Sequence, residues 1–394
     1  MVVDRRTLAV MPVVDLILKS VAGSFTEEVE VGPLCWSNEL VLHVLELKTN
    51  GPVATLAGVA HTVTEQVRQV NAILRPLGGQ LMPGAMHPFM DPDADTRLWP
   101  HGYNEVYAAY DRIFGCRGHG WSNLQSMHLN LPFQGDDELG RLHAAIRVVL
   151  PLIPAIAASS PVKDGRVTGL LDTRIDVYRK NQQRIPSLTG RVIPEPVFSR
   201  VAYEALLGTL YRDLAPYDPD GILQEEWVNS RGAIVRFERD SIEIRLIDIQ
   251  ETPAADIAVA ALVLALIRAL ATERWQGLEV LKRADTARLV AILDQSVATG
   301  ESSVIGDRDY LRLFGVRDAK LSAADLWRHL YRELLPIDAG LDQEVARAMA
   351  LILAEGPLAR RIMRALGPAP SRAALCEVYQ ELCVCLADGA LFVP

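Results

Sequence analysis

A carboxylate and two guanidinium groups stand close together in one stretch of the chain, and this is the first chemistry that the sequence offers. In residues 241–249 apolar and polar side chains alternate, which predicts a strand with Glu243 and Arg245 on one face. Residues 233–237 form a second apolar run whose only charge is Arg236, and the polar residues between the two runs predict a hairpin. On pattern alone, the polar face is either an ordinary solvated face with an ion pair or one wall of an active site.

Two more carboxylates lie in residues 39–48, whose apolar pattern predicts a second strand. Glu39 and Glu46 are seven residues apart, and this odd spacing places them on opposite faces of a regular strand. Both carboxylates can therefore serve one site only if a bulge or the end of the strand lies between them.

A third strand is predicted over residues 125–131, with Ser126, His128 and Asn130 on one face. A lone histidine in such a place is more often a structural hydrogen-bonding partner than a ligand. Three polar-faced strands change this balance, because an antiparallel sheet commonly buries one face and leaves the other in water. The wet face would here hold Glu, His, Asn and Arg side chains, which favours a functional site.

The rest of the pattern predicts one compact body. We expect a single domain over residues 1–394, with a sheet-and-loop catalytic part over about 1–275 and an almost wholly helical part over about 276–394. Thr252, Ser322 and Ser371 each precede a helical pattern and are expected to cap its first turn. Residues 78–121 and 163–196 are long, irregular and rich in polar and aromatic residues. Loops of this length commonly line a site, so we expect substrate specificity to reside there.

The composition excludes several classes of protein. Hydrophobic residues make up 49% of the 394 residues and charged residues 23%, which is typical of a soluble globular protein. The net charge of -9 argues against nucleic-acid binding. Five cysteines without a C-x-x-C pair predict a reducing, cytoplasmic location. The most apolar run, residues 257–267, is too short to cross a bilayer and predicts a buried helix, and the N-terminal residues lack a secretory pattern, so no membrane partner is expected.

Five short motifs occur in the order seen in one known family. They are ELVLHVLELKT (39–49), HPF (87–89), SMHLN (126–130), ASSP (158–161) followed by TG (168–169), and IEIRLID (242–248). Over about residues 1–275 the chain resembles the glutamate–cysteine ligase family, of the carboxylate–amine ligase type. Each motif alone is weak, whereas five in sequence order are specific.

The resemblance implies an α+β fold of the glutamine-synthetase type. In that fold a curved antiparallel sheet, backed by helices, carries the active site on its polar concave face. The implied chemistry depends on ATP and Mg²⁺: a carboxylate attacks the γ-phosphate, and an amine then displaces phosphate from the acyl phosphate to give an amide. Such chemistry needs cations that neutralise developing charge, and oxygen ligands suit magnesium. The implied partners are ATP and small amino-acid or amine substrates, while a homo-oligomer is left open.

The resemblance also assigns roles to single residues. The metal-ligand candidates are Glu39, Glu46, His128 and Glu243, and of the two on the second strand Glu46 is the better match. Asn130 stands where the family's paired-histidine strand has its second histidine, which weakens the metal-binding role of that strand.

The anion-binding roles fall mainly on arginines. Arg245 and Glu243 are the catalytic candidates, and Arg245 is expected to contact the transferred phosphoryl group or the substrate carboxylate. The further candidates for binding substrate or phosphate are Arg174, Arg236 and Asn130. Asp248 has the opposite parity on its strand, so we expect it to orient a neighbour.

One feature departs from the family pattern. Family members begin with a strand carrying Gly-x-Glu-x-Glu, whose glutamates hold the metals, whereas Met1-Val2-Val3-Asp4 resembles the end of that strand. We expect a longer natural N-terminus. The alternative is a catalytically weak or inactive relative that acts as a metabolite-binding or regulatory protein. A guanidino kinase of the same fold is a third option, although its guanidinium pocket is not recognisable. The pattern determines neither the donor carboxylate nor the acceptor amine.

Overall fold

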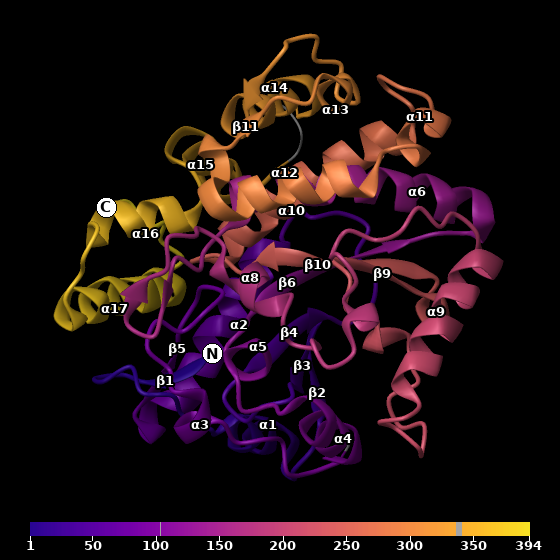
Figure 1. Ribbon diagram of the computed structural model, residues 1–394. Helices are drawn as coiled ribbons and strands as arrows, with labels where there is room; N and C mark the ends of the chain where they lie inside the picture. Colours follow the sequence, from indigo (N-terminus) through magenta and orange to yellow (C-terminus); the bar gives the residue numbers. More distant parts are fainter. Residues whose placement is uncertain (103, 336–340) are drawn as a thin grey trace.

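The computed structural model describes residues 1–102, 104–335 and 341–394, and Figure 1 traces the chain through its helices and strands. The longer helices are α1 (Val14–Ala22), α2 (Val59–Leu74), α4 (Asn104–Phe114), α6 (Gly135–Val149), α9 (Arg200–Leu214), α10 (Pro253–Ala271), α12 (Thr286–Thr299), α14 (Ala323–Leu334), α15 (Gln343–Glu355), α16 (Leu358–Leu366) and α17 (Arg372–Asp388). The shorter helices are α3 (Pro92–Asp95), α5 (His119–Ser122), α7 (Pro154–Ala157), α8 (Thr173–Tyr178), α11 (Leu278–Lys282) and α13 (Arg308–Arg312).

The strands are short, and every named pair is antiparallel. They are β1 (Val2–Asp4), β2 (Glu28–Val31), β3 (Leu34–Asn38), β4 (Leu45–Thr49), β5 (Gly79–Leu81), β6 (Ser126–Pro132), β7 (Val162–Lys163), β8 (Arg166–Val167), β9 (Ala233–Arg236), β10 (Ser241–Asp248), β11 (Val304–Ile305) and β12 (Leu321–Ser322). Helices and antiparallel strands together confirm the α+β class. In the described part of the chain, however, the strands form five separate sheets, of which the largest are β6-β10-β9 and β2-β3-β4, instead of one curved sheet.

The predicted strand over residues 39–48 is confirmed only from Leu45 onward, as β4, and backbone hydrogen bonds explain why residues 39–44 are not part of it. Leu42 N donates to Arg97 O (2.9 Å), and Val2 N donates to His43 O (2.8 Å). These groups are thus satisfied by two other segments instead of by a neighbouring strand. The chain reverses there, and β3 and β4 pair with each other on either side of the reversal.

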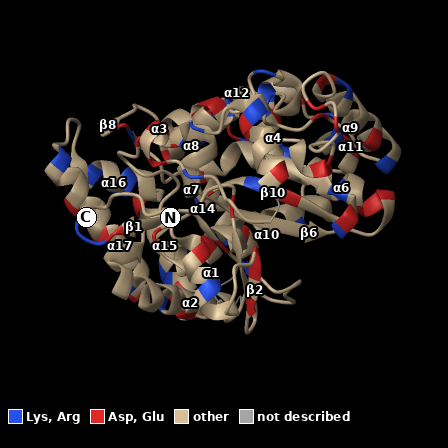
Figure 2. Cartoon of the chain, turned by 90° about the horizontal axis from the view of Figure 1, so that it is seen from below, with Lys and Arg blue, Asp and Glu red and all other residues tan. Residues whose placement is uncertain are grey.

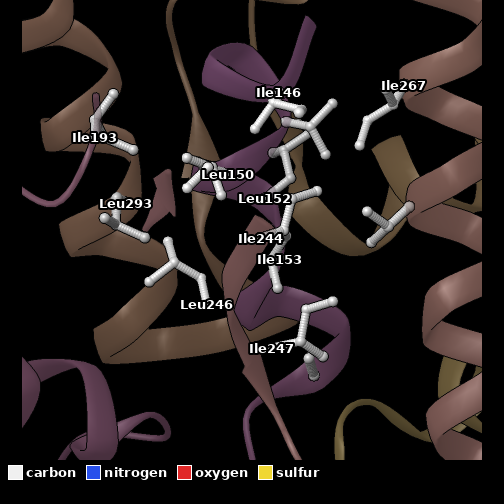
Figure 3. Close-up of a cluster of buried hydrophobic side chains, with 14 of the residues drawn as sticks. Ile146, Leu150, Leu152, Ile153, Ile193, Ile244, Leu246, Ile247, Ile267 and Leu293 are labelled. Carbon is white, nitrogen blue, oxygen red and sulfur yellow. The ribbon is translucent and has the colours of Figure 1, made fainter. Parts of the chain in front are cut away.

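The predicted hairpin is confirmed as β9 and β10, which are joined by a 3-10 turn over Phe237–Arg239. Strand β10 also pairs with β6, and its register shifts between Ile244 and Ile247. Leu246 and Ile247, at this shift, are both buried, and Figure 3 shows them with Ile244 in one apolar cluster. Gly232 precedes β9 because a Cβ there would lie 2.6 Å from the Leu246 side chain.

The most apolar segment forms α10, which begins after Thr252 as predicted. Ala255 N donates to Thr252 Oγ1 (3.2 Å), and proline occupies the first helical position. The helix has 19 residues, more than the predicted apolar run, and is long and apolar enough to cross a membrane by length and composition. Of its most apolar window, 67% is buried inside the fold, against α2, α6 and α15 among others. This is the position of a core helix.

The C-terminal part is mostly helical, with two of its helices capped as predicted. Ser322 Oγ accepts from Asp325 N (3.0 Å), and Ser371 Oγ accepts from Ala374 N (3.1 Å). The short pair β11–β12 is a departure from the expected wholly helical pattern. A buried ion pair between Arg361 and Glu251 joins α16 to the residues that follow β10.

Candidate active site

Glu243 lies within β10, and its carboxylate is held between two guanidinium groups. Arg245 Nε donates to Glu243 Oε1 (2.6 Å), and Arg236 Nη1 donates to Oε2 (3.4 Å). The side chains of Glu243 and Arg236 are each 7% exposed. Burial raises the pKa of Glu243, but Arg245, His128 and Arg236 outweigh burial and lower this pKa to about 2. This face of β10 is therefore a buried, charge-compensated one and not an ordinary solvated one.

Strand β6 places His128 and Asn130 beside this carboxylate. Asn130 is directly opposite Glu243 in the strand register, and His128 Nδ1 lies 3.6 Å from Glu243 Oε1. Ser126 Oγ lies 2.9 Å from His128 Nε2 and orients the ring. Desolvation lowers the pKa of His128, and Arg245 adds to this effect while Glu243 opposes it. The imidazole is thus favoured in its neutral form, which is the form that can bind a metal ion.

The reversal between β3 and β4 carries Glu39 and Glu46 toward the same site. Ser37 Oγ donates to Glu46 Oε2 (2.6 Å), and Lys48 Nζ lies 3.6 Å from that oxygen. The side chain of Glu39 is exposed at the surface, but many protein atoms surround it and reduce the hydration of its carboxylate. That desolvation, followed by the charges of Glu46 and Glu243, raises the pKa of Glu39 to about 8.

Arg174 is held at the edge of the site by Asp248. The two form an ion pair, with side chains 3% and 0% exposed. Asp248 Oδ2 also accepts from Ser159 N (2.8 Å), and Arg174 Nη2 donates to Arg245 O (3.3 Å). Burial lowers the pKa of Arg174, but Asp248 more than reverses this and raises it. Asp248 thus orients a neighbour, as its parity suggested.

The carboxylates and arginines that the sequence singled out influence one another's pKa, so the structure brings most of them into one region. Among residues 1–102, 104–335 and 341–394, no three His, Cys, Asp or Glu side chains are close enough to form a ready metal site. The metal-ligand roles of Glu39, Glu46, His128 and Glu243 therefore stay predictions. In the view of Figure 2, acidic and basic residues are interspersed over the chain, so the charge of this site is a local property.

Sequence reasoning missed several neighbours of the site. Tyr107, on α4, accepts from Asn38 Nδ2 (2.9 Å), and burial together with Glu39 raises the pKa of its phenol to about 12. Ser37 lies opposite Glu46 because β3 pairs with β4, whereas Lys48 lies two residues along β4 from Glu46, on the same face. Lys48 was visible as a charge near Glu46, but no spacing in the sequence signals Ser37 or Tyr107.

The fold and the site together define an α+β protein with a charged site across antiparallel strands. The chain belongs to glutamate-cysteine ligase family 2, whose sequence model matches residues 19–381. This confirms the family that the motifs indicated.

Three relatives illustrate the match. The chain is 38% identical to an Archaeoglobus fulgidus protein, named "Uncharacterized protein", over 66% of this chain and 70% of that protein. It is 31% identical to a "Putative glutamate--cysteine ligase 2-1" of Nocardioides sp., over 60% of this chain and 56% of the relative. It is 28% identical to a protein of the same name from Rubrobacter xylanophilus, over 45% and 44%. The chain thus spans about half the length of the two relatives that carry a ligase name.

Proposed function

We propose that the protein is an ATP- and Mg²⁺-dependent carboxylate–amine ligase on a glutamine-synthetase-like fold. A carboxylate oxygen of an amino-acid substrate would attack the γ-phosphorus of ATP, with ADP as leaving group. The amine nitrogen of a second substrate would then attack the acyl carbon, phosphate would leave, and the amine would lose a proton. Family membership supports the reaction class. The observation that points to these residues is that Arg245 and Arg236 both donate hydrogen bonds to the carboxylate of Glu243.

The arginines supply positive charge where this reaction develops negative charge. Arg174 Nη2 donates to the backbone carbonyl of Arg245 (3.3 Å), so Arg174 lies against the strand that carries Arg245. Both are fixed by buried carboxylates, so they need little reorganisation to bind an anion. A preorganised pair of guanidinium groups suits a phosphoryl group or a carboxylate, which guanidinium groups bind in a bidentate manner.

The carboxylates at the β3–β4 reversal fit a magnesium ion. Glu39 and Glu46 offer the hard oxygen ligands that Mg²⁺ prefers. Desolvation and neighbouring carboxylates raise the pKa of Glu39 to about 8, more than Lys48 offsets, so a bound cation would favour the ionised carboxylate. Glu243 fits less well, because both of its oxygens already accept from arginines. A bound ion would neutralise phosphate oxygens beside these residues.

The decisive experiment measures phosphate release from ATP with Mg²⁺ and pairs of amino acids or amines. We expect amine-dependent release, and we expect Glu243→Gln to lower it by about 10²–10³-fold. Glu344→Gln, an exposed glutamate on α15, is the matched control and should keep full activity. If no pair of substrates supports turnover and Glu243→Gln leaves nucleotide binding unchanged, the proposal is wrong.

A second candidate is a catalytically weak or inactive relative that binds a metabolite or regulates another protein. The observation that favours it is the lack of a ready three-ligand metal group within the described residues. Calorimetry separates the two candidates, since a ligase binds ATP in a Mg²⁺-dependent manner. A non-catalytic relative would bind its metabolite or protein partner without Mg²⁺-dependent ATP binding.

A further inference from the structure

A second hollow lies away from Glu243, between the turn that joins α4 to α5 and the residues around and after α8. Its volume is about 820 Å³, which lies within the range of pockets that hold small molecules. Phe114 and Trp121 line it from the α4–α5 side, and Lys180 and Arg184 line it from the α8 side. We call this hollow the α4–α8 cleft.

The α4–α8 cleft is positively charged in an acidic protein. Its charged lining residues are Arg112, Lys163, Lys180 and Arg184, against Asp111 and Asp176. Arg112 Nη1 donates to Tyr217 O (2.8 Å) and Arg184 Nη1 donates to Ile113 O (2.9 Å). In the part of the chain that the structure describes, neither guanidinium forms an ion pair with a carboxylate. Since the carbonyls hold each group in place without neutralising it, both remain available to an anion.

One wall of the cleft is aromatic. The rings of Phe114 and Trp121 stack with centroids 5.7 Å apart and an interplanar angle of 27°. Tyr110 packs against Trp121 from α4 at a centroid distance of 4.9 Å. Such a supported ring offers a face on which a planar heterocycle can stack.

The opposite sides of the cleft are fixed to each other. Asn181 Nδ2 donates to Gly120 O (2.5 Å), and Trp121 Nε1 donates to Asn181 O (3.3 Å). A Cβ at position 120 would lie 1.4 Å from Asn181 Oδ1, so this close approach requires glycine. The aromatic wall and the cationic side therefore keep a defined separation before any ligand arrives.

From these features we infer that the α4–α8 cleft binds a mononucleotide-type ligand, that is, a planar heterocycle bearing phosphate. The ring would stack on the Phe114–Trp121 wall and the phosphate would meet Arg112 and Arg184. The inference uses neither the ligase reaction nor Glu243. Helix α8 contributes to both regions: Arg174 faces Asp248 in the candidate active site, while Asp176 lines the cleft.

Calorimetry without divalent ions tests the inference, with AMP, ATP, adenosine and pyrophosphate as probes. We expect AMP and ATP to bind, and to bind more tightly than either adenosine or pyrophosphate. The double variant Arg112→Ala/Arg184→Ala should weaken AMP binding about tenfold or more, because charge-assisted hydrogen bonds are lost. Trp121→Leu should weaken AMP binding and leave pyrophosphate binding unchanged. Arg332→Ala is the matched control, since this exposed arginine on α14 also donates to a backbone carbonyl.

Lys180→Ala keeps the test decisive if the double variant does not fold. The Lys180 side chain is 64% exposed and pairs with Asp176 (2.8 Å), so its loss should not disturb folding and, because it leaves Asp176 unpaired in the cleft, should weaken AMP binding about threefold. The inference is overturned if AMP and ATP do not bind without metal, or if all cleft variants bind AMP as the Arg332→Ala control does. Mg²⁺-dependent phosphate release, measured separately with Glu243→Gln, tests the ligase proposal alone.

Discussion

In the two hairpins of the candidate active site, the pKa values of the carboxylates are shifted in opposite directions. In β9–β10, Glu243 is 7% exposed and compensated by Arg245 and Arg236, and its pKa is lowered to about 2. At the β3–β4 hairpin, Glu39 is open to solvent, yet desolvation and neighbouring carboxylates raise its pKa to about 8. The less buried carboxylate is therefore the harder one to ionise.

The comparison shows that neighbouring charges decide whether desolvation is reversed: arginines outweigh it at Glu243, whereas carboxylates add to it at Glu39. Both oxygens of Glu243 accept from arginines, so its carboxylate is compensated without a metal ion. Glu39 lacks a full counter-charge, so it is poised to take a proton or a metal ion. This difference supports the proposal that the β9–β10 hairpin binds anions and the β3–β4 hairpin binds cations, and the proposal can be tested at both hairpins.

The largest expected effect follows from removing the main counter-charge of Glu243. Arg245→Met leaves a buried carboxylate with only the longer contacts to Arg236 and His128, and we expect the free energy of unfolding to fall by about 3 kcal/mol. Urea denaturation at pH 7 measures this. The double variant Arg245→Met/Glu243→Gln should recover most of the loss, because the buried charge is gone.

Arg239→Met is the control for that prediction, because this exposed arginine lies in the turn of the same hairpin. It should change the free energy of unfolding by less than about 0.5 kcal/mol. An equal loss in Arg245→Met and in the double variant would show that lost packing, and not an uncompensated charge, is the cause.

A somewhat smaller effect should appear in acid. The pKa of Glu243 is lower in the folded state than its ordinary value of 4.5, so its stabilising contribution is present above pH 4.5 and is lost as the pH falls toward 2. The difference corresponds to at most about 3 kcal/mol. Urea denaturation from pH 7 to pH 2.5 should show a stability difference between the wild type and Glu243→Gln that shrinks below pH 4.5. A constant difference over this range would contradict the lowered pKa.

Alternation and turn chemistry were enough to predict the β9–β10 hairpin, β6, and the starts of α10, α14 and α17. These predictions rest on local rules, in which a strand alternates and a Ser or Thr caps a helix. The reversal at residues 40–43 was not predictable from the sequence. Its backbone groups are satisfied by Val2 and Arg97, and such distant partners leave no local signature.

In the site too, local features were predictable from the sequence and features that depend on distant partners were not. The pairing of Glu243 with Arg245 was visible, because both residues share one face of one strand. The position of Glu39 beside Glu46 depends on the β3–β4 register, and the buried partner of Arg174 lies 74 residues away in the sequence. Motif order supplied the family, but only the fold shows which charges compensate each other.

The third prediction concerns Glu39, whose contribution to stability should change with pH in the direction opposite to that of Glu243. Because the folded-state pKa of Glu39 lies above its ordinary value of 4.5, the folded state holds more protons between pH 4.5 and about 8. The stability contribution of Glu39 should therefore fall as the pH rises through this window. Glu39→Gln should be more stable than the wild type at pH 8.5, by a modest amount since the side chain is open to solvent.

Magnesium sharpens this third prediction. If Glu39 and Glu46 hold the ion, Mg²⁺ should raise the thermal stability of the wild type at pH 8.5 and have little effect on Glu39→Gln. Differential scanning calorimetry with Ca²⁺-free buffers measures both. If Glu39→Gln is as stable as the wild type and responds to Mg²⁺ to the same extent, Glu39 does not bind the cation.

The smallest direct effect is expected at Lys48, the one cation that the β3–β4 hairpin sets against its carboxylates. Lys48 Nζ lies 3.1 Å from Glu28 and 3.6 Å from Glu46, but its side chain is 42% exposed, so Lys48→Met should cost less than about 1 kcal/mol at pH 7. Its indirect effect is more informative. Lys48 lowers the pKa of Glu39, so the variant should raise that pKa further and steepen the loss of stability between pH 7 and 9. If the denaturation curves show no steeper loss of stability, Lys48 does not affect the pKa of Glu39. The two hairpins would then differ in two ways: in the direction of their pKa shifts, and in whether their charges influence one another.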